Sequence, residues 1–205
     1  MRRLAVYRKT LQAFGFCFLL ANYGRMVIFA APKNPTLEGI HDEIRNLYGE
    51  NVRLRVCGIC IQNERILLIN HSLYGKDTFF WSPPGGGVQF GETATEALER
   101  EFLEETGLRV KVGKLLFINE HIEAPLHAVE MFFQIDSFEG TLKTGEDPEL
   151  SAEGQVIEQV QFLSWDELTQ FAPNQLHRIF SMIGSLDGVF HLQNYIPGQN
   201  SGLEK

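Results

Sequence analysis

Three glutamates stand close together near the middle of the chain, and their type and spacing suit the binding of a metal cation. Glu101, Glu104 and Glu105 fall within five residues, just before Gly107. Carboxylate oxygens are ligands that Mg²⁺ and Mn²⁺ prefer, and Mg²⁺ commonly binds one or two carboxylates together with the phosphates of a substrate. The acids could instead form an exposed acidic surface, and the residues around them decide between the two interpretations.

The segment that carries these acids is predicted to be helical. Residues 92–106 contain no Pro or Gly, are rich in Ala, Leu, Glu and Arg, and end at Gly107, a residue type favoured just past a helix. With about 100° of rotation per residue, the three acids share a face with Ala97 and Leu98, which ought to be buried. Like charges on a partly buried face are destabilising without a cation. The pattern therefore favours a site for Mg²⁺ or Mn²⁺.

The acids also belong to a longer pattern that resembles the Nudix box, the signature G-x5-E-x7-R-E-U-x-E-E-x-G-U of the Nudix hydrolases, where U is a bulky aliphatic or similar residue. The matching residues run without a gap and are Gly86, Glu92, Arg100, Glu101, Phe102, Glu104, Glu105, Gly107 and Leu108. Phe102 is a departure, because this position is more often aliphatic. The resemblance to the family's layout extends from about Val52 to Phe190 and does not cover the first thirty residues.

The resemblance implies a function and a set of functional residues. The family's reaction is hydrolysis of a nucleoside diphosphate linked to another group, such as a nucleoside triphosphate or an ADP-ribose-like substrate. Glu101, Glu104 and Glu105 match the family's metal ligands, and Arg100 is expected to pair with Glu92 and fix the helix against the preceding loop. Glu153, in a polar loop, is the expected general base. Glu120, Glu123 and Glu101 itself are alternatives for that role.

A loop with the sequence PPGGG precedes the helix and is expected to contact the substrate. Gly85, Gly86 and Gly87 can adopt backbone angles closed to other residues, so their N–H groups could approach phosphate oxygens. Such a run is more often only a turn, and it gains weight because it leads into the glutamate helix. Trp81, just before the loop, could stack on a base, although large aromatic residues more often belong to the core.

Composition and charge indicate an ordinary globular protein, and the order of the predicted elements indicates the α+β class. The chain has 205 residues, of which 44% are hydrophobic and 21% charged, and a formal net charge of -8. An acidic chain without a cluster of Lys and Arg is a poor candidate for nucleic-acid binding. The mixed order of strand and helix patterns predicts a mixed β-sheet sandwiched between helices, an α/β/α arrangement that agrees with the Nudix fold that the resemblance implies.

The predicted organisation has four parts. Residues 1–31 form an N-terminal extension of uncertain role, residues 32–50 a short helical lead-in, residues 51–190 the Nudix domain, and residues 191–205 a polar tail. The extension has basic residues and an apolar run, as in a signal peptide, but a polar interruption and the lack of a clean cleavage site argue against export. We therefore expect a cytoplasmic protein with no membrane association, and a homodimer is left open.

Two cysteines spell a C-x-x-C pattern, but their context favours a structural role. Cys57 and Cys60 lie in the segment VRLRVCGICIQ, which is predicted to be a strand, and residues three apart on a strand face opposite sides. A zinc site would need a second pair of ligands, and none follows at the right spacing. We expect both to be buried. The segment RILLIN is predicted to form a second strand paired with the first.

Two other classes of function remain as alternatives. A Nudix-type domain could be a non-catalytic sensor of a nucleotide ligand, although such reuse usually erodes the acids, and here all of them are present. The chain could also be an RNA-processing pyrophosphohydrolase, against which its acidic balance weighs.

Overall fold

The computed structural model describes residues 51–72, 79–123, 126–145 and 157–198. All of them belong to one compact unit, Ile44–Lys205. The predicted extension 1–31, the predicted helix within 32–50 and Glu153 lie outside the described residues.

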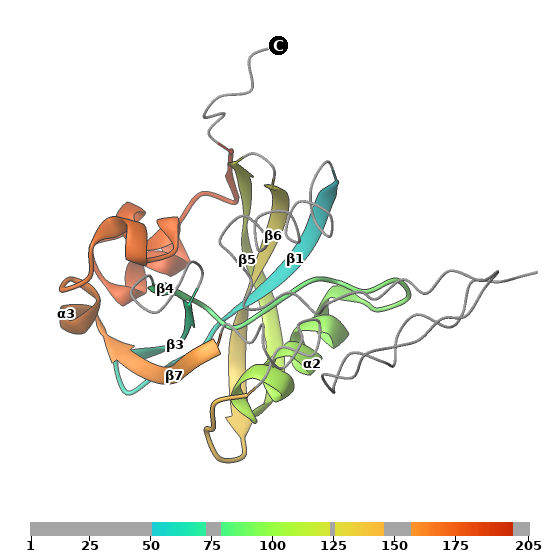
Figure 1. Ribbon diagram of the computed structural model, residues 1–205, viewed down its shortest axis with the longest axis horizontal. Coiled ribbons are helices and arrows are strands. Elements are labelled where there is room, and N and C mark those ends of the chain that lie inside the picture. Colours follow the sequence, from blue (N-terminus) through green and yellow to red (C-terminus); the bar gives the residue numbers. More distant parts are fainter. Residues whose placement is uncertain (1–50, 73–78, 124–125, 146–156, 199–205) are drawn as a thin grey trace, which may run out of the picture. The chain divides into compact units, whose positions relative to one another are not determined.

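Among the described elements, one α-helix stands between two runs of strands, and the other helices follow the second run (Figure 1). The strands are β1 (Val52–Ile59), β2 (Ile61–Gln62), β3 (Arg65–Ser72), β4 (Phe79–Ser82), β5 (Arg109–Glu123), β6 (Leu126–Glu139), β7 (Ile157–Ser164) and β8 (Tyr195–Ile196). The α-helices are α2 (Ala94–Thr106) and α3 (Trp165–Leu168), and three 3₁₀ helices follow: η1 (Pro173–Gln175), η2 (Arg178–Met182) and η3 (Leu186–His191).

The strands form two four-stranded sheets. The first has the order β1-β6-β5-β8 and is mixed, because β1 runs parallel to β6 and β8 parallel to β5, while β5 and β6 are antiparallel. The second is antiparallel, with β3 paired to β2, β4 and β7. The predicted pairing of the first two strand segments is therefore wrong for β1, which joins the other sheet. Of the first predicted strand segment, only the part that forms β2 pairs with β3, through a tight turn at Asn63 and Glu64, whose φ angles are 50° and 58°.

Helices cover the sheets on two sides, as the α+β prediction requires, and each side has its own apolar core. One core lies under α2 and includes Leu98 and Phe102 with Val56 and Leu67 from the two sheets. The other lies under the C-terminal helices and includes Phe117 and Phe132, whose rings stack at 4.6 Å. Figure 1 shows α2 on one side of the strands and the C-terminal helices, coloured orange to red, on the other.

The buried cysteines agree with the sequence-based expectation. Cys57 is 4% exposed and belongs to the core under the C-terminal helices, whereas Cys60 is 1% exposed and belongs to the core under α2. Burial raises the pKa of the Cys60 thiol to about 12. Both residues therefore act as small apolar core residues, not as a metal or redox pair.

The chain after α3 is divided into short elements. In the segment 174–184 the chain is extended at Leu176 and His177, where His177 N–H donates to the Trp81 carbonyl on β4. This tertiary contact divides the segment into short 3₁₀ helices. Within the predicted polar tail, residues 191–205, β8 pairs with β5 at Ile118 and Asn119.

None of the helices within the described residues is long and apolar enough to cross a membrane.

Candidate active site

Helix α2 carries the predicted acids, and its ends are defined by local sequence. Thr93 caps the N-terminus, accepting from Glu96 N–H while Glu96 accepts from Thr93 N–H at 2.8 Å. Gly107 ends the helix with a left-handed φ of 71°, which glycine adopts without strain. Both ends of the helix are therefore set by residues within the segment from Thr93 to Gly107.

The acidic face of α2 is buried, as the helical spacing predicted. Glu101 is 7% and Glu105 is 5% exposed, in the same class as Ala97 and Leu98. The Glu104 side chain is 29% exposed. The three glutamates thus form the buried and half-buried margin of the helix, and they are not a solvated acidic surface.

Arg100 connects the helix to the loop before it. Its Nε and Nη2 donate to the two carboxylate oxygens of Glu92 at 2.8 and 3.1 Å, and Nη2 also donates to the Gly87 carbonyl at 3.0 Å. Its Nη1 donates to Glu101 and Glu104 at 2.8 and 3.0 Å. The predicted pair with Glu92 is confirmed, and the arginine also neutralises two of the three predicted metal ligands.

The glycine loop runs beside β1 as an added edge. Val56 N–H donates to the Gly86 carbonyl and Gly58 N–H to the Pro84 carbonyl, both at 2.9 Å, while Val88 N–H donates to the Leu54 carbonyl at 3.0 Å. These backbone bonds fix the loop on the first sheet.

Two glycines are required by the close approach of the loop to its neighbours. Gly85 has a φ of 148°, and a Cβ there would overlap the Val56 carbonyl. A Cβ on Gly86 would overlap the carboxylate of Glu101. Gly85 N–H donates to Glu105 Oε2 at 2.8 Å in a buried contact. The loop can therefore lie directly against the acids only because these residues are glycines.

The acids fit a divalent cation by chemistry and by charge. Burial raises the pKa of Glu101, and hydrogen bonding and the charge of Arg100 oppose this only in part. A raised carboxyl pKa means that the negative charge is incompletely compensated, which a bound hard cation would correct.

The side chains themselves point to different partners. Glu101 and Glu104 turn to Arg100, and Glu105 turns to Gly85. Within the ranges that the structure describes, no three His, Cys, Asp or Glu side chains are grouped to hold a metal ion. Glu101, Glu104 and Glu105 are therefore neighbours on one face, and their joint ligation of a metal stays a prediction.

A second polar group lies on the first sheet and was not predicted. Cross-strand register places Arg55 of β1, Glu130 of β6 and Asn119 of β5 in one row. Asn119 Nδ2 and His177 Nε2 contact Glu130 Oε2 at 2.7 and 3.1 Å, and Arg55 Nε lies 3.7 Å from Glu130 Oε1. We call Arg55, Asn119, Glu130 and His177 the polar row.

Charge in the polar row is strongly compensated. Burial alone would raise the pKa of Glu130, but His177, Arg55 and Asn119 outweigh it and lower this pKa to about 2. Arg55 also donates from Nη2 to the Gly85 carbonyl at 3.3 Å. Gly85 thus contacts Glu105 through its N–H and Arg55 through its carbonyl, so the polar row and the acids of α2 meet at one residue.

His71 of β3 lies in the same neighbourhood. Burial and then the positive charge of Arg55 lower the pKa of His71 to about 4, although a hydrogen bond to the Phe80 backbone opposes this. Ser82 Oγ lies 3.5 Å from His71 Nδ1. At neutral pH this imidazole is uncharged and adds a polar, neutral group beside Arg55.

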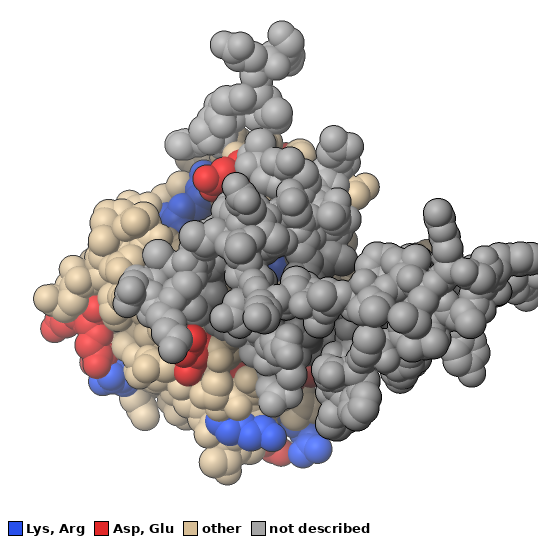
Figure 2. Space-filling model, viewed as in Figure 1, with Lys and Arg blue, Asp and Glu red and all other residues tan. Residues whose placement is uncertain are grey.

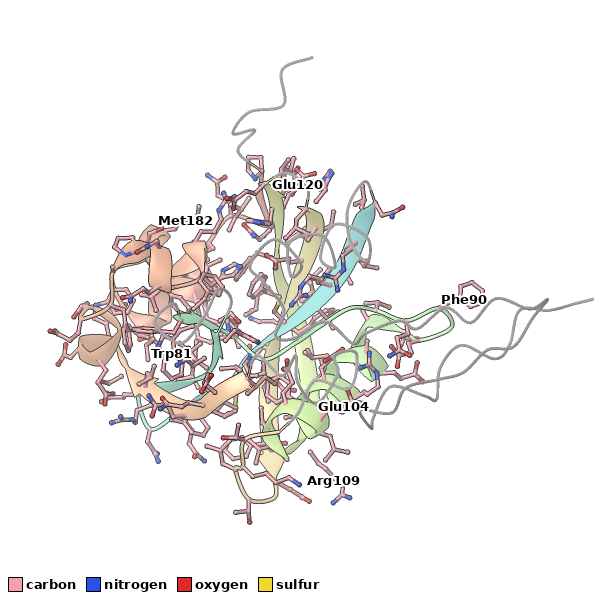
Figure 3. All side chains as sticks on the ribbon, viewed as in Figure 1. Trp81, Phe90, Glu104, Arg109, Glu120 and Met182 are labelled. Carbon is pink, nitrogen blue, oxygen red and sulfur yellow. The ribbon has the colours of Figure 1, made fainter. Side chains whose placement is uncertain are left out.

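Trp81 does not occupy the place that base stacking requires. It is 2% exposed, belongs to the core under the C-terminal helices, and lies 5.8 Å from the ring of Phe171. Figure 3 shows it among the strands and away from Glu104. The expectation that Trp81 binds substrate is corrected here: core packing covers its ring.

Two of the alternatives for the general base, Glu120 and Glu123, lie within the described residues. Glu120 accepts from Tyr195 Oη at 2.6 Å and lies 3.0 Å from His127 Nε2. The Tyr195 hydrogen bond, and then that of His127, lower the pKa of Glu120. Figure 3 shows Glu120 at the end of the strands away from Glu104. Glu123 ends β5 on the same side, and Glu153 lies outside the described residues.

Charged surface groups agree with the acidic composition. On the face shown in Figure 2, the described Lys and Arg side chains lie in small groups beside Asp and Glu, and no broad basic area is visible among the described residues. This distribution gives no support to nucleic-acid binding.

Comparison with known proteins gives the family of the domain. The family model of the NUDIX domain matches residues 52–181. A solved MutT NUDIX hydrolase from Burkholderia pseudomallei aligns with a TM-score of 0.52 and 24% identity, over 65% of this chain and 95% of that one. This likeness shows the fold.

Curated relatives have several substrates. An ADP-ribose pyrophosphatase of Methanocaldococcus jannaschii is 38% identical over 97 residues, which is 45% of this chain and 55% of that protein. A human diphosphoinositol polyphosphate phosphohydrolase 3-alpha is 31% identical over 44% of this chain and 56% of that protein. An RNA pyrophosphohydrolase of Pasteurella multocida is 38% identical over 31% of each chain. The match thus spans 55% and 56% of the first two relatives and 31% of the third.

Proposed function

The chain belongs to the Nudix domain family, and on this basis we propose that it hydrolyses a pyrophosphate bond in a nucleoside diphosphate linked to another group, using Mg²⁺ or Mn²⁺. The observation that carries the proposal is the buried acidic face of α2 lying against a loop in which Gly85 packs against the β1 backbone and Gly86 against the Glu101 carboxylate. Nudix hydrolases generally use divalent metal ions. The chain carries the residues of the family's signature, with Phe102 at a position that is more often aliphatic.

The proposed reaction needs charge compensation and a positioned water. Water attacks one phosphorus while a base takes its proton. The bridging P–O bond breaks, so the attacked phosphate keeps the water oxygen and the other phosphate leaves with the bridging oxygen. When bound, a divalent cation would neutralise charge on the diphosphate and polarise the reacting groups. Glu101, Glu104 and Glu105 would hold it, Arg100 would keep the helix and loop in register, and the loop N–H groups would face phosphate oxygens.

The relatives act on different substrates, and each of these substrates is a candidate for this chain. The ADP-ribose pyrophosphatase supports a nucleoside-diphosphate substrate, and the diphosphoinositol relative adds a non-nucleotide diphosphate. The acidic net charge of -8 disfavours an RNA end, despite the RNA pyrophosphohydrolase match. A non-catalytic sensor would need no intact set of acids, whereas here the whole set is present.

A substrate screen tests the proposal. Nucleoside triphosphates, ADP-ribose, nucleotide sugars, dinucleoside polyphosphates, a diphosphoinositol polyphosphate and 5′-triphosphate RNA are incubated with the full chain and Mg²⁺, and released phosphate and nucleotide are measured. We expect turnover of at least one small diphosphate and none in excess EDTA. Full turnover in EDTA would exclude the metal role, and binding without turnover across the set would favour the sensor.

Glu153 is proposed as the general base. Glu153→Gln should lower kcat by roughly 10²–10⁴ with little change in Mn²⁺ affinity, because a base that is not a ligand affects only proton transfer. Glu101→Gln should weaken Mn²⁺ binding and turnover together. If Glu153→Gln keeps near-normal kcat while Glu120→Gln or Glu123→Gln does not, the base lies at the end of β5 instead.

A further inference from the structure

Two arginines lie beside the acids of α2, and they differ in what their N–H groups do. Arg100 uses all three of its guanidinium nitrogens on Glu92, Glu101, Glu104 and the Gly87 carbonyl. Arg55 uses Nη2 on the Gly85 carbonyl and directs Nε toward Glu130, and among the described residues its Nη1 has no partner. The Arg55 side chain is 28% exposed, so a ligand can reach it.

Buried partners fix the position of Arg55. Glu130 has a side chain that is 10% exposed, and its Oε2 is occupied by Asn119 and His177, which leaves Oε1 to face Arg55. A buried ion pair adds little net stability over well-packed apolar residues. A carboxylate held by two further polar groups from other elements is therefore better explained by a need for a guanidinium at a defined place.

That place is next to the glycine loop and the acids. Gly85 contacts Arg55 through its carbonyl and Glu105 through its N–H, so a single residue separates the guanidinium from a predicted metal ligand. Burial lowers the pKa of Arg55, but Cys57, Glu130, Glu105 and Glu101 more than offset this, so the group is a permanent cation. An unused donor on a fixed cation suits an anionic oxygen, and guanidinium groups match phosphate geometry.

We propose that Arg55 binds a phosphate oxygen of the diphosphate substrate and that Glu130 is the positioning residue that holds its guanidinium against the glycine loop. The inference rests on the proposed function, and it names residues that lie outside the Nudix-box segment. The phosphate would then be held from two sides, by the acidic face of α2 through a cation and by Arg55 directly.

Calorimetric titration of inorganic pyrophosphate with Mg²⁺ into the full chain tests this. Arg55→Gln should raise the Kd for pyrophosphate about 10- to 100-fold, the size of a charge-assisted hydrogen bond. Its KM for a substrate found in the screen should rise by a similar factor, with a smaller change in kcat. Glu130→Gln should raise the Kd less, because Arg55 keeps its charge and loses only its alignment. Arg65→Gln is the matched control, since Arg65 of β3 is paired with Glu167 of α3.

A double variant protects the test against misfolding. Arg55→Gln could leave Glu130 as an unpaired buried charge, whereas Arg55→Gln with Glu130→Gln removes both charges and retains amide donors and acceptors. We expect the double variant to fold and to bind pyrophosphate as weakly as Arg55→Gln. If the wild type binds pyrophosphate and either Arg55 variant binds it as tightly, the inference fails and the proposed function stands. If the wild type neither binds pyrophosphate nor hydrolyses any diphosphate, both fail.

Discussion

The glutamate helix and the polar row are both buried groups of charged residues, but they are built in opposite ways. The helix residues from Glu92 to Glu105 are contiguous in sequence, and their placement follows from one capping box, one helical period and one terminal glycine. The polar row takes Arg55, Asn119, Glu130 and His177 from three strands and a 3₁₀ segment. Local sequence rules therefore place the first group, whereas the fold of the whole chain places the second.

The two groups also differ in charge balance. In the helix, Glu92, Glu101 and Glu104 share a single arginine, and the pKa of Glu101 is raised by burial. In the polar row one carboxylate has an arginine, a histidine and an amide, and its pKa is lowered to about 2. The acids of α2 lack sufficient positive charge, which favours binding of a cation. The carboxylate of the polar row is already compensated, which favours a fixed position for the residues around it. This difference separates binding of a metal from positioning of a side chain.

The largest effect is expected from removing a predicted ligand on α2. Glu105→Gln should reduce turnover more than about 100-fold, beyond the range for a residue that only supports a ligand, because the carboxylate charge is lost. The amide oxygen can still accept from Gly85 N–H, so the fold should be kept. Turnover is measured across a Mn²⁺ titration, and unfolding by circular dichroism. Glu99→Gln is the control on the exposed side of the same helix; equal turnover in both variants would contradict a metal role for Glu105.

Acid stability should distinguish the polar row from the helix. The pKa of Glu130 lies at about 2, below its ordinary value of 4.5. A depressed carboxyl pKa stabilises the folded state above the unfolded pKa, and this contribution is lost as the pH falls from about 4.5 toward 2. It amounts to roughly 3 kcal/mol. Glu130→Gln should therefore lower the free energy of unfolding at pH 7 and approach the wild type near pH 2.

Urea unfolding at several pH values measures this difference. Glu158→Gln on β7 is the control, because Glu158 is exposed. A gap between wild type and Glu130→Gln that stays constant from pH 7 to pH 3 would show that Glu130 is not held as a buried anion.

The same contrast explains what the sequence could predict. The structure confirms the stop of the helix at Gly107, the pair Arg100–Glu92 and the opposite burial of Cys57 and Cys60, because each depends on residues close in sequence. The helix predicted from residue 92 begins two residues later, at Ala94. The pairing of β1 was missed because its partner, β6, lies about seventy residues later. Trp81 was misassigned since exposure of an aromatic residue depends on the C-terminal segment that covers it.

The polar row had one signal in the sequence, and it is weak. Glu130 is a charged residue inside the apolar segment HAVEMFFQI, in strand register with Ala128 and Phe132, which are buried. An acid on the buried face of a strand requires a partner. The sequence does not reveal which partner. Arg55 reaches Glu130 through the parallel pairing of β1 with β6, and His177 comes from a segment 47 residues later that is hydrogen-bonded to Trp81.

The smallest expected effect concerns the cap that begins α2. Thr93→Ala removes the side-chain acceptor for Glu96 N–H and should lower the free energy of unfolding by about 1 kcal/mol, with a small decrease in kcat because the helix start lies beside Glu92. Ser164 caps α3 with the same capping box, closed by Glu167, and is remote from the acids of α2 in sequence and contact. Ser164→Ala should cost a similar free energy and leave kcat unchanged. The two variants should therefore lose a similar free energy of unfolding and differ only in which helix loses its cap. Equal decreases in kcat at matched stability would mean that general loosening of the fold, and not the placement of the glutamate helix, controls the rate.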